Sequence, residues 1–381
     1  MSTPLPPPSQ SPVSSSSRSQ FVPPQQQPAQ PSADVLPFPQ PPTDAQPQSR
    51  AEWQSQSPAE SPNVTQPQAP ADALARRPLN LPNHFPFRLP VTRSGRVALA
   101  LCVVYLVWGS TYMAVHLSLE SFPPLMLSGL RNLFAGIGLF IFAARRDPVW
   151  PTFAEVRNAA AVGTLLVGLS SGMLAFGMRT VETGTAAVMV ATVPLFATVI
   201  AAIAGRKVAK GEWVAVGLGL VGIALLNHGD PSSGSTAGSL AILCGAIFWA
   251  GGSFLAGRLK LPSDLLVSTA LQISLGGAMA TMVAWVSGER IVSMGFTAFL
   301  AYLYLMLVGS MAAYVAYAYL IRHTSPIIAS SCMYVNPVVA VVIGALFLGE
   351  VITKWTVMAT LIILASVGLS FWFDYKRRGL V

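Results

Sequence analysis

Ten long apolar segments limit what this chain can fold into more than any other feature. They follow one another from Arg96 to the C-terminal end of the sequence, and short polar stretches separate them. A helix rises about 1.5 Å per residue, so about 20 apolar residues cross the ~30 Å hydrocarbon core of a bilayer. We therefore predict an all-α polytopic membrane protein with ten transmembrane helices. The predicted spans are Val97–Leu117, Pro124–Ala143, Val156–Met178, Thr185–Ala204, Trp213–Asn227, Gly238–Leu259, Leu265–Val286, Ala298–Leu320, Pro326–Leu348 and Lys354–Phe373.

The composition favours a membrane protein over a soluble one. Hydrophobic residues make up 52% of the chain and charged residues 10%, whereas soluble domains contain about 25% charged residues. The three cysteines, Cys102, Cys244 and Cys332, all lie inside apolar segments. This placement excludes a disulfide framework and a paired zinc-binding spacing. We expect neither a metal nor another cofactor.

Residues 1–90 differ in composition from the rest of the chain. They hold 22 of the 31 prolines, and glutamine and serine fill much of the remainder. Such a segment buries too little apolar surface to offset the entropy of ordering, so we predict a disordered N-terminal tail. Two alternatives stay open. The Pro-rich tail could dock a partner, as a non-transporting membrane scaffold would require, or the native start could lie nearer Val91.

Lysine and arginine are distributed unequally between the two sides of the predicted topology. With the N-terminus in the cytoplasm, the cytoplasmic segments from Arg76 onward carry 17 of them, including those of the basic C-terminal segment 374–381. The opposite side carries three, Arg179, Arg290 and Lys354. The positive-inside rule therefore predicts that both termini are cytoplasmic. The formal net charge of +8 is then a topology signal, and we expect a lipid bilayer rather than nucleic acid as the partner.

The two halves of the membrane region resemble each other. Trp108 and Trp249 lie in the first spans of the two halves, 141 residues apart, and an arginine and a proline recur at an offset of 143. We predict two five-helix repeats, 97–228 and 237–373. Because five is odd, the second repeat must cross the membrane in the opposite sense to the first. Inverted repeats are typical of secondary transporters, whose substrate site lies near the bilayer midplane.

Arg131 lies about eight residues into the second span. A cation at this depth costs several kcal/mol if it faces lipid, so it should face a cavity or a partner. We interpret it as a counter-charge for an anionic group on a small-molecule substrate. The alternatives are a structural ion pair or a side chain that snorkels to one face. Gln272 occupies the repeat-equivalent position and is a second candidate for the site.

Two prolines occupy matching depths in the two halves. Pro194 and Pro337 each lie about ten residues into a span, where a proline removes one backbone hydrogen bond and favours a kink. We interpret both as hinge or gating positions, although an ordinary helix bend explains them as well. Asn336 adds a polar group beside the second proline.

The remaining candidates are aromatic or hydroxyl-bearing side chains within spans. Helix packing or an interfacial belt is the alternative for each of them, but Trp108 and Trp249 lie too deep for a belt. The candidate substrate-binding residues are Trp108, Ser110, Tyr112, Arg131, Trp249, Gln272, Tyr314, Tyr334 and Asn336, with Pro194 and Pro337 as hinges.

Catalytic motifs do not favour an enzyme. The sequence contains no phosphate-binding G-x-x-x-x-G-K-[ST] pattern, so ATP does not drive this chain directly. Gly168, Ser170 and Gly172 fit G-x-S-x-G, but a nucleophile elbow needs a strand–turn–helix context, and this motif lies inside a predicted helix. The two glycines also have the spacing of a close helix contact, which is our interpretation. An intramembrane serine hydrolase remains the alternative.

Four segments resemble one transporter family. These are 107–112 (VWGSTY), 322–326 (RHTSP), 334–338 (YVNPV) and 347–350 (FLGE). They resemble EamA-type transporters of the drug/metabolite transporter superfamily, over about residues 97–373. The first repeat departs from the pattern, because Arg206 follows Gly205 where the second repeat has Glu350 after Gly349.

The resemblance implies a carrier of the inner (plasma) membrane that exports amino acids, other metabolites or drugs by alternating access. It also implies a central cavity lined by helices one to four and six to nine, with helices five and ten peripheral. A nucleotide-sugar-type carrier is the nearest alternative. The substrate, the coupling ion and the oligomeric state stay open, and a homodimer is one alternative.

Overall fold

The computed structural model describes residues 93–146, 148–229, 234–324, 328–329 and 331–377. All of them belong to one compact unit, Thr65–Val381. The predicted N-terminal tail and the start of the predicted ninth span at Pro326 lie outside the described residues.

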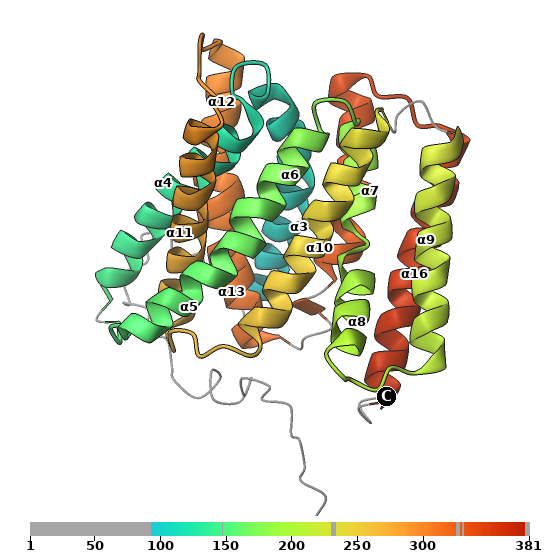
Figure 1. Ribbon diagram of the computed structural model, residues 1–381, viewed down its shortest axis with the longest axis horizontal. Helices are drawn as coiled ribbons and strands as arrows, with labels where there is room; N and C mark the ends of the chain where they lie inside the picture. The colour runs from blue at the N-terminus through green and yellow to red at the C-terminus, as the bar shows by residue number, and fades with distance from the viewer. Residues whose placement is uncertain (1–92, 147, 230–233, 325–327, 330, 378–381) are drawn as a thin grey trace, which may run out of the picture. The chain divides into compact units, whose positions relative to one another are not determined.

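Long helices that run between two ends of the unit make up the described part (Figure 1). Eight of them are long and apolar enough to cross a membrane, Cys332–Leu348 is a shorter apolar helix, and Lys210–Gly229 is a further helix of 20 residues. The predicted all-helical fold is therefore confirmed. The elements are α3 (Arg93–Ser118), α4 (Pro124–Ala144), α5 (Phe153–Gly163), η1 (Thr164–Leu169), α6 (Ser170–Gly177), α7 (Thr183–Val190), α8 (Val193–Ile203), α9 (Lys210–Gly229), α10 (Thr236–Ala256), α11 (Leu265–Val286), α12 (Phe296–Tyr304), η3 (Leu305–Ala312), α13 (Ala313–His323), α15 (Cys332–Ile343), η4 (Gly344–Leu348) and α16 (Lys354–Arg377), where η marks a π-helical segment.

Contacts between loops define two opposite faces of the unit. At one face, which we call the Glu350 face, the Glu350 carboxylate accepts hydrogen bonds at the start of α7, and the Thr180 hydroxyl bonds to that of Ser235 just before α10. At the other, the Arg206 face, Arg206 pairs with Asp374 at the end of α16. Helix α3 ends at the Glu350 face, whereas α10 begins there. The first helices of the two halves therefore run in opposite directions.

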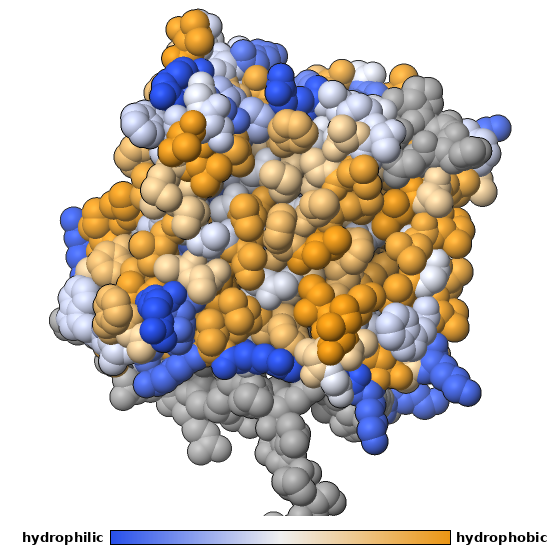
Figure 2. All heavy atoms as spheres, viewed as in Figure 1, coloured by the Kyte–Doolittle hydropathy of each residue, from blue (hydrophilic) through white to orange (hydrophobic). Residues whose placement is uncertain are grey.

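The surface has the distribution that a bilayer requires. A broad hydrophobic zone covers the middle of the visible face, and hydrophilic residues gather at its two margins (Figure 2). Many large apolar side chains of the described helices are exposed, among them Phe134, Ile203 and Leu361. Lipid chains satisfy such a surface, whereas water does not.

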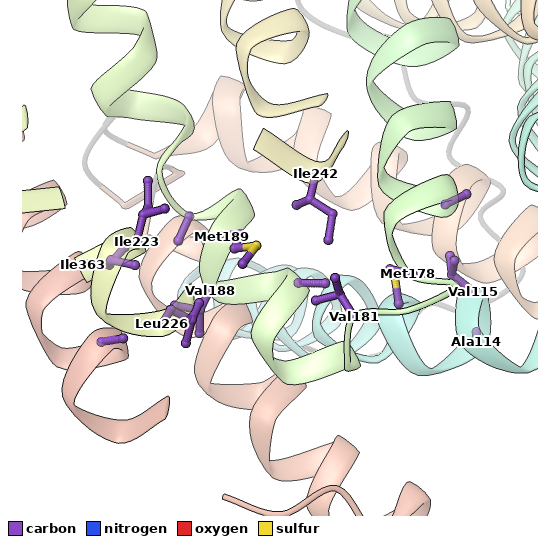
Figure 3. Packing of buried hydrophobic residues seen from close by; sticks show 14 of the residues in the cluster. Ala114, Val115, Met178, Val181, Val188, Met189, Ile223, Leu226, Ile242 and Ile363 are labelled. Atoms are coloured by element: carbon purple, nitrogen blue, oxygen red, sulfur yellow. The ribbon is translucent and has the colours of Figure 1, made fainter. Parts of the chain in front are cut away.

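Near the Glu350 face, a buried apolar cluster joins helices from both halves. Val115 of α3, Met178 after α6 and Ile242 of α10 belong to it, and Val188 and Met189 of α7 extend it toward α9 and α16 (Figure 3). Each of these side chains is almost fully buried. This cluster fixes the start of α7, which carries the contact to Glu350.

Helices α4 and α11 lie unusually close together. A Cβ atom built on Gly136 would lie 2.5 Å from the Ser274 backbone nitrogen, and one on Gly129 would lie 2.5 Å from that of Thr281. Small residues let helix backbones approach in membranes, where dispersion contacts take over from the hydrophobic effect. The second span of each half is thus held against its counterpart.

The two predicted hinge prolines lie in different local structures. Helix α7 ends at Val190 and α8 begins at Val193, so the fourth span is broken just before Pro194. Pro337 instead lies inside the continuous helix α15, which changes to the π-helical segment η4 beyond Ile343. The helix is therefore unbroken at Pro337, but a π-helical segment follows it.

A second irregularity recurs in both halves. The π-helical segment η1 begins at Thr164 in the third span, and η3 begins at Leu305 in the eighth, an offset of 141 residues (305 − 164). Such segments are uncommon and frequently lie at functional sites. The sequence pattern did not predict either of them.

Candidate functional site

Arg131 carries the buried charge around which the candidate site is built. It lies on the third turn of α4, a helix that begins with Pro124 at its first position. Its Nε atom is buried and has no hydrogen-bond partner among the described residues. The Tyr314 phenol of α13 lies within electrostatic reach of the guanidinium group. The structure therefore places a cation with spare hydrogen-bonding capacity beside an aromatic hydroxyl.

Three aromatic side chains continue from this cation. The ring of Trp108 from α3 lies 5.8 Å from that of Tyr314 between centroids, at 74°, and 5.0 Å from that of Tyr317, at 49°. These separations and tilts are those of favourable aromatic pairs. The predicted residues Arg131, Trp108 and Tyr314 are thus brought together, and Tyr317 joins them.

Tyr317 also lines a cleft of about 260 Å³. The cleft follows α8 from Pro194 toward Arg206, which lies just beyond the end of the helix. From Pro194 to Ile203 the helix rises about 14 Å (9 × 1.5 Å), close to half of the ~30 Å hydrocarbon core. Its other walls come from α15 and α16. The lining residues are Pro194, Ala197, Thr198, Ala201, Arg206, Tyr317, Met333, Ser370, Phe371 and Asp374.

The position of α16 in this wall differs from what the family resemblance implies. The tenth helix was expected at the periphery, yet Ser370, Phe371 and Asp374 line the cleft. The reason is local: the hydroxyl groups of Thr198 and Ser370 lie 3.4 Å apart, and Arg206 Nη1 donates to Asp374 Oδ1 at 2.9 Å. These contacts hold the last turns of α16 against α8.

Tyr334 and Asn336 lie on two sides of α15. The Tyr334 ring packs on Phe371 of α16, with centroids 5.9 Å apart. The side-chain oxygen of Asn336 is buried without a hydrogen-bond partner among the described residues. Its backbone carbonyl lies against Gly109 of α3, next to Trp108. Asn336 therefore offers an acceptor, whereas Arg131 offers a donor.

The other predicted site residues lie elsewhere. The Ser110 hydroxyl bonds to that of Tyr304 at 2.6 Å, and Tyr112 packs against the apolar cluster of Figure 3. Trp249 packs on the fourth span around its break, and Gln272 donates to Ser268 one turn earlier in its own helix. The hydrogen bond that Gln272 donates is therefore to its own helix and not to Arg131.

Sequence reasoning missed the polar residues at the mouth of the cleft. The sequence marks Arg206 only as the residue that follows Gly205, yet its Nη2 donates to Glu212 Oε2 at 2.7 Å, and the Glu212 side chain is fully buried. Glu212 lies in α9, which begins at Lys210 rather than at the predicted Trp213. An acidic residue at the start of a predicted span was the available signal.

The G-x-S-x-G segment lies in helical backbone and makes close helix contacts. A Cβ atom on Gly168 would lie 2.8 Å from the Gly276 carbonyl oxygen, and one on Gly172 would lie 2.6 Å from Leu125. Ser170 begins α6 and is buried. The packing interpretation accounts for this motif.

Two inverted halves with a cleft between their helices define a polytopic membrane protein of the transporter class. The chain belongs to the EamA-like transporter family, whose model matches residues 95–228 and 236–372. It is a membrane transporter.

Relatives and a solved structure agree with this assignment. The chain is 40% identical over 272 residues to an uncharacterized inner membrane transporter of Escherichia coli K12, YedA, covering 71% of this chain and 89% of that protein. It is 25% identical over 300 residues to a probable amino-acid metabolite efflux pump of Salmonella typhimurium, covering 73% of this chain and 96% of that protein. One crystal structure shares the fold, with a TM-score of 0.51 and 14% identity over 72% of this chain and 97% of that one.

Proposed function

We propose that this protein is a secondary transporter of the inner membrane that exports small organic molecules carrying an anionic group, such as amino acids or drug-like acids. The Arg206 face would be cytoplasmic, because the positive-inside rule places the lysine- and arginine-rich loops there. The name of the Salmonella relative supports an amino-acid-type substrate.

The buried Nε of Arg131, which has no hydrogen-bond partner among the described residues, is the observation that carries this proposal. An unpaired cation at this depth costs several kcal/mol, so a purely structural role would call for a carboxylate beside it. The described neighbour is instead the phenol of Tyr314. A substrate carboxylate supplies the missing partner, and the rings of Trp108 and Tyr317 supply an apolar wall for the rest of the molecule.

Alternating access gives the cleft its role. The cleft ends near the middle of the membrane, at Pro194 and Tyr317, and the aromatic group continues from Tyr317 to Arg131. A substrate entering at the Arg206 face would travel along α8 and bind at this end. Movement of the two halves against each other would then open the Glu350 face.

Transport by purified protein in liposomes tests the proposal. Counterflow of radiolabelled amino acids, nucleotide sugars and aromatic acids would be measured for the full chain and for Arg131→Ala, Arg131→Lys and Phe134→Ala. Phe134 lies one turn after Arg131 on α4 and is half exposed to lipid, so its variant is the matched control.

Removal of a charge-assisted hydrogen bond costs about 1.5–3 kcal/mol, so Arg131→Ala should weaken transport by about 10- to 100-fold. Arg131→Lys should recover part of it, because lysine keeps the charge but loses the planar fork. Phe134→Ala should transport normally. Full transport by Arg131→Ala would remove Arg131 from the site, and counterflow of nucleotide sugars alone would favour the alternative carrier class.

A further inference from the structure

Glu350 joins the two halves by hydrogen bonds at the Glu350 face. It follows Gly349, whose left-handed backbone (φ +70°) ends η4 and turns the chain toward α7. Its carboxylate accepts three hydrogen bonds: from the Thr183 nitrogen at 2.6 Å, the Thr183 hydroxyl at 2.9 Å and the Gly184 nitrogen at 3.0 Å. The end of the ninth span is thereby tied to the first turn of the fourth.

The surrounding residues leave space for this carboxylate alone. A Cβ atom on Gly344 would collide with the Glu350 carboxylate and lie 2.7 Å from the Thr183 hydroxyl. One on Gly184 would lie 3.0 Å from Val341 and 3.5 Å from the Glu350 carboxylate. Only about 10 Å³ of free space remains beside Glu350. The two spans are therefore closed on each other at this face.

The equivalent position of the first half has the opposite charge. Gly205, two residues after the end of α8, also has a left-handed backbone (φ +88°), but the next residue is Arg206. A guanidinium group only donates hydrogen bonds, so it cannot cap the amide groups at a helix start. Arg206 bonds to Glu212 and Asp374 instead, and it lies at the mouth of the cleft.

We infer that the Glu350 carboxylate is the latch that closes the transport path at the Glu350 face. Arg206 cannot form the same cap in the first half, and the cleft reaches the Arg206 face, so the form with the cleft open at that face is the resting state. This inference rests on the proposed function for alternating access. With the Arg206 face cytoplasmic, the resting carrier loads from the cytoplasm, as an exporter requires.

Reporter cysteines on the two sides of the path test the latch. Thr185 is buried beside Glu350, and Ala201 lines the cleft, so Thr185→Cys and Ala201→Cys report the two faces. Each would be placed in a background in which Cys102, Cys244 and Cys332 are replaced by alanine. The rate of labelling by a water-soluble maleimide would be measured in nanodiscs, where both faces meet the reagent.

Glu350→Gln should speed labelling at position 185 by about tenfold and slow labelling at position 201. Tenfold corresponds to the net loss of one charge-assisted hydrogen bond, about 1.4 kcal/mol. The reciprocal change is the expected sign of a population shift between two forms.

Glu289→Gln is the matched control. Glu289 also caps a helix start at this face, accepting from the Met126 nitrogen at 2.8 Å, but it joins α4 to the loop after α11, and these helices pack along their length. It should leave both labelling rates unchanged.

Three results would overturn the latch. Faster labelling at both positions in Glu350→Gln would show a cap that only stabilises the fold. Unchanged rates would show that the contact does not hold the face shut, and a reciprocal shift in Glu289→Gln as well would show a general response to lost caps. The labelling experiment needs no substrate, so its result can be interpreted whatever the counterflow experiment finds. If the latch is refuted, the proposed role of Arg131 is unaffected.

Discussion

The close contact between α4 and α11 predicts a large effect from a single methyl group. In Gly136→Ala the new Cβ would lie 2.5 Å from the Ser274 nitrogen and 2.7 Å from its Cα. Ordinary contacts begin near 3.4 Å, so the backbones must separate by about 0.9 Å (3.4 − 2.5). Backbone atoms cannot rotate away as a flexible side chain can. The strain must therefore be relieved by moving whole helices.

The size of the effect follows from two opposing terms. Overpacking a filled interior costs about 1–3 kcal/mol, and the separation also loosens the contact at Gly129 one heptad earlier. Alanine is favoured over glycine in a helix by about 1 kcal/mol, which offsets part of this cost. We expect a net destabilisation of about 1–2 kcal/mol, which corresponds to a fall in melting temperature of about 2–6 °C.

Thermal unfolding in detergent, followed by tryptophan fluorescence, measures this fall. Gly217→Ala is the control, because Gly217 lies inside α9 with nothing within 4 Å of its added Cβ. There only the helix preference of alanine acts, and the melting temperature should stay the same or rise. Equal melting temperatures for Gly136→Ala and Gly217→Ala would refute the close contact between α4 and α11.

Two further predictions concern the cleft. Arg206→Ala should lower the free energy of unfolding by about 3 kcal/mol, because it removes the ion pair of the fully buried Glu212; an unchanged melting temperature would contradict this. Pro194→Ala should slow transport more than Pro337→Ala does, since only Pro194 follows a break that a continuous helix would close. Initial counterflow rates at equal expression compare the two, and equal slowing would show that the break has no special role.

The fold was predictable from the sequence because hydrophobic length determines where a helix can cross a bilayer. The predicted Leu265–Val286 has the same bounds in the structure, and Pro124–Ala143 ends one residue early. The irregularities were not predictable. The π-helical segment η1 packs against α11 and η3 packs against α4, and nothing in the local pattern of apolar residues distinguishes either segment from ordinary helix.

The candidate site was predictable only where burial of a polar group carried a clear energetic cost. Arg131 was identified in this way, and Trp108 and Tyr314 proved to lie with it. Gln272 was inferred from repeat symmetry alone, and the structure bonds it to Ser268 instead. Contacts between distant spans decide which face of a helix lines the path, and a single sequence does not contain them.

The differences between the halves bear directly on direction. Two identical inverted repeats would give two forms of equal free energy, open to opposite sides, and the carrier would have no preferred resting state. This chain instead has unlike partners at equivalent positions: a carboxylate on a helix start at Glu350 against an ion-paired guanidinium at Arg206. A difference of only about 1.4 kcal/mol populates one form tenfold over the other. A difference of this size between the two unlike contacts is therefore enough to set where the empty carrier waits for its substrate.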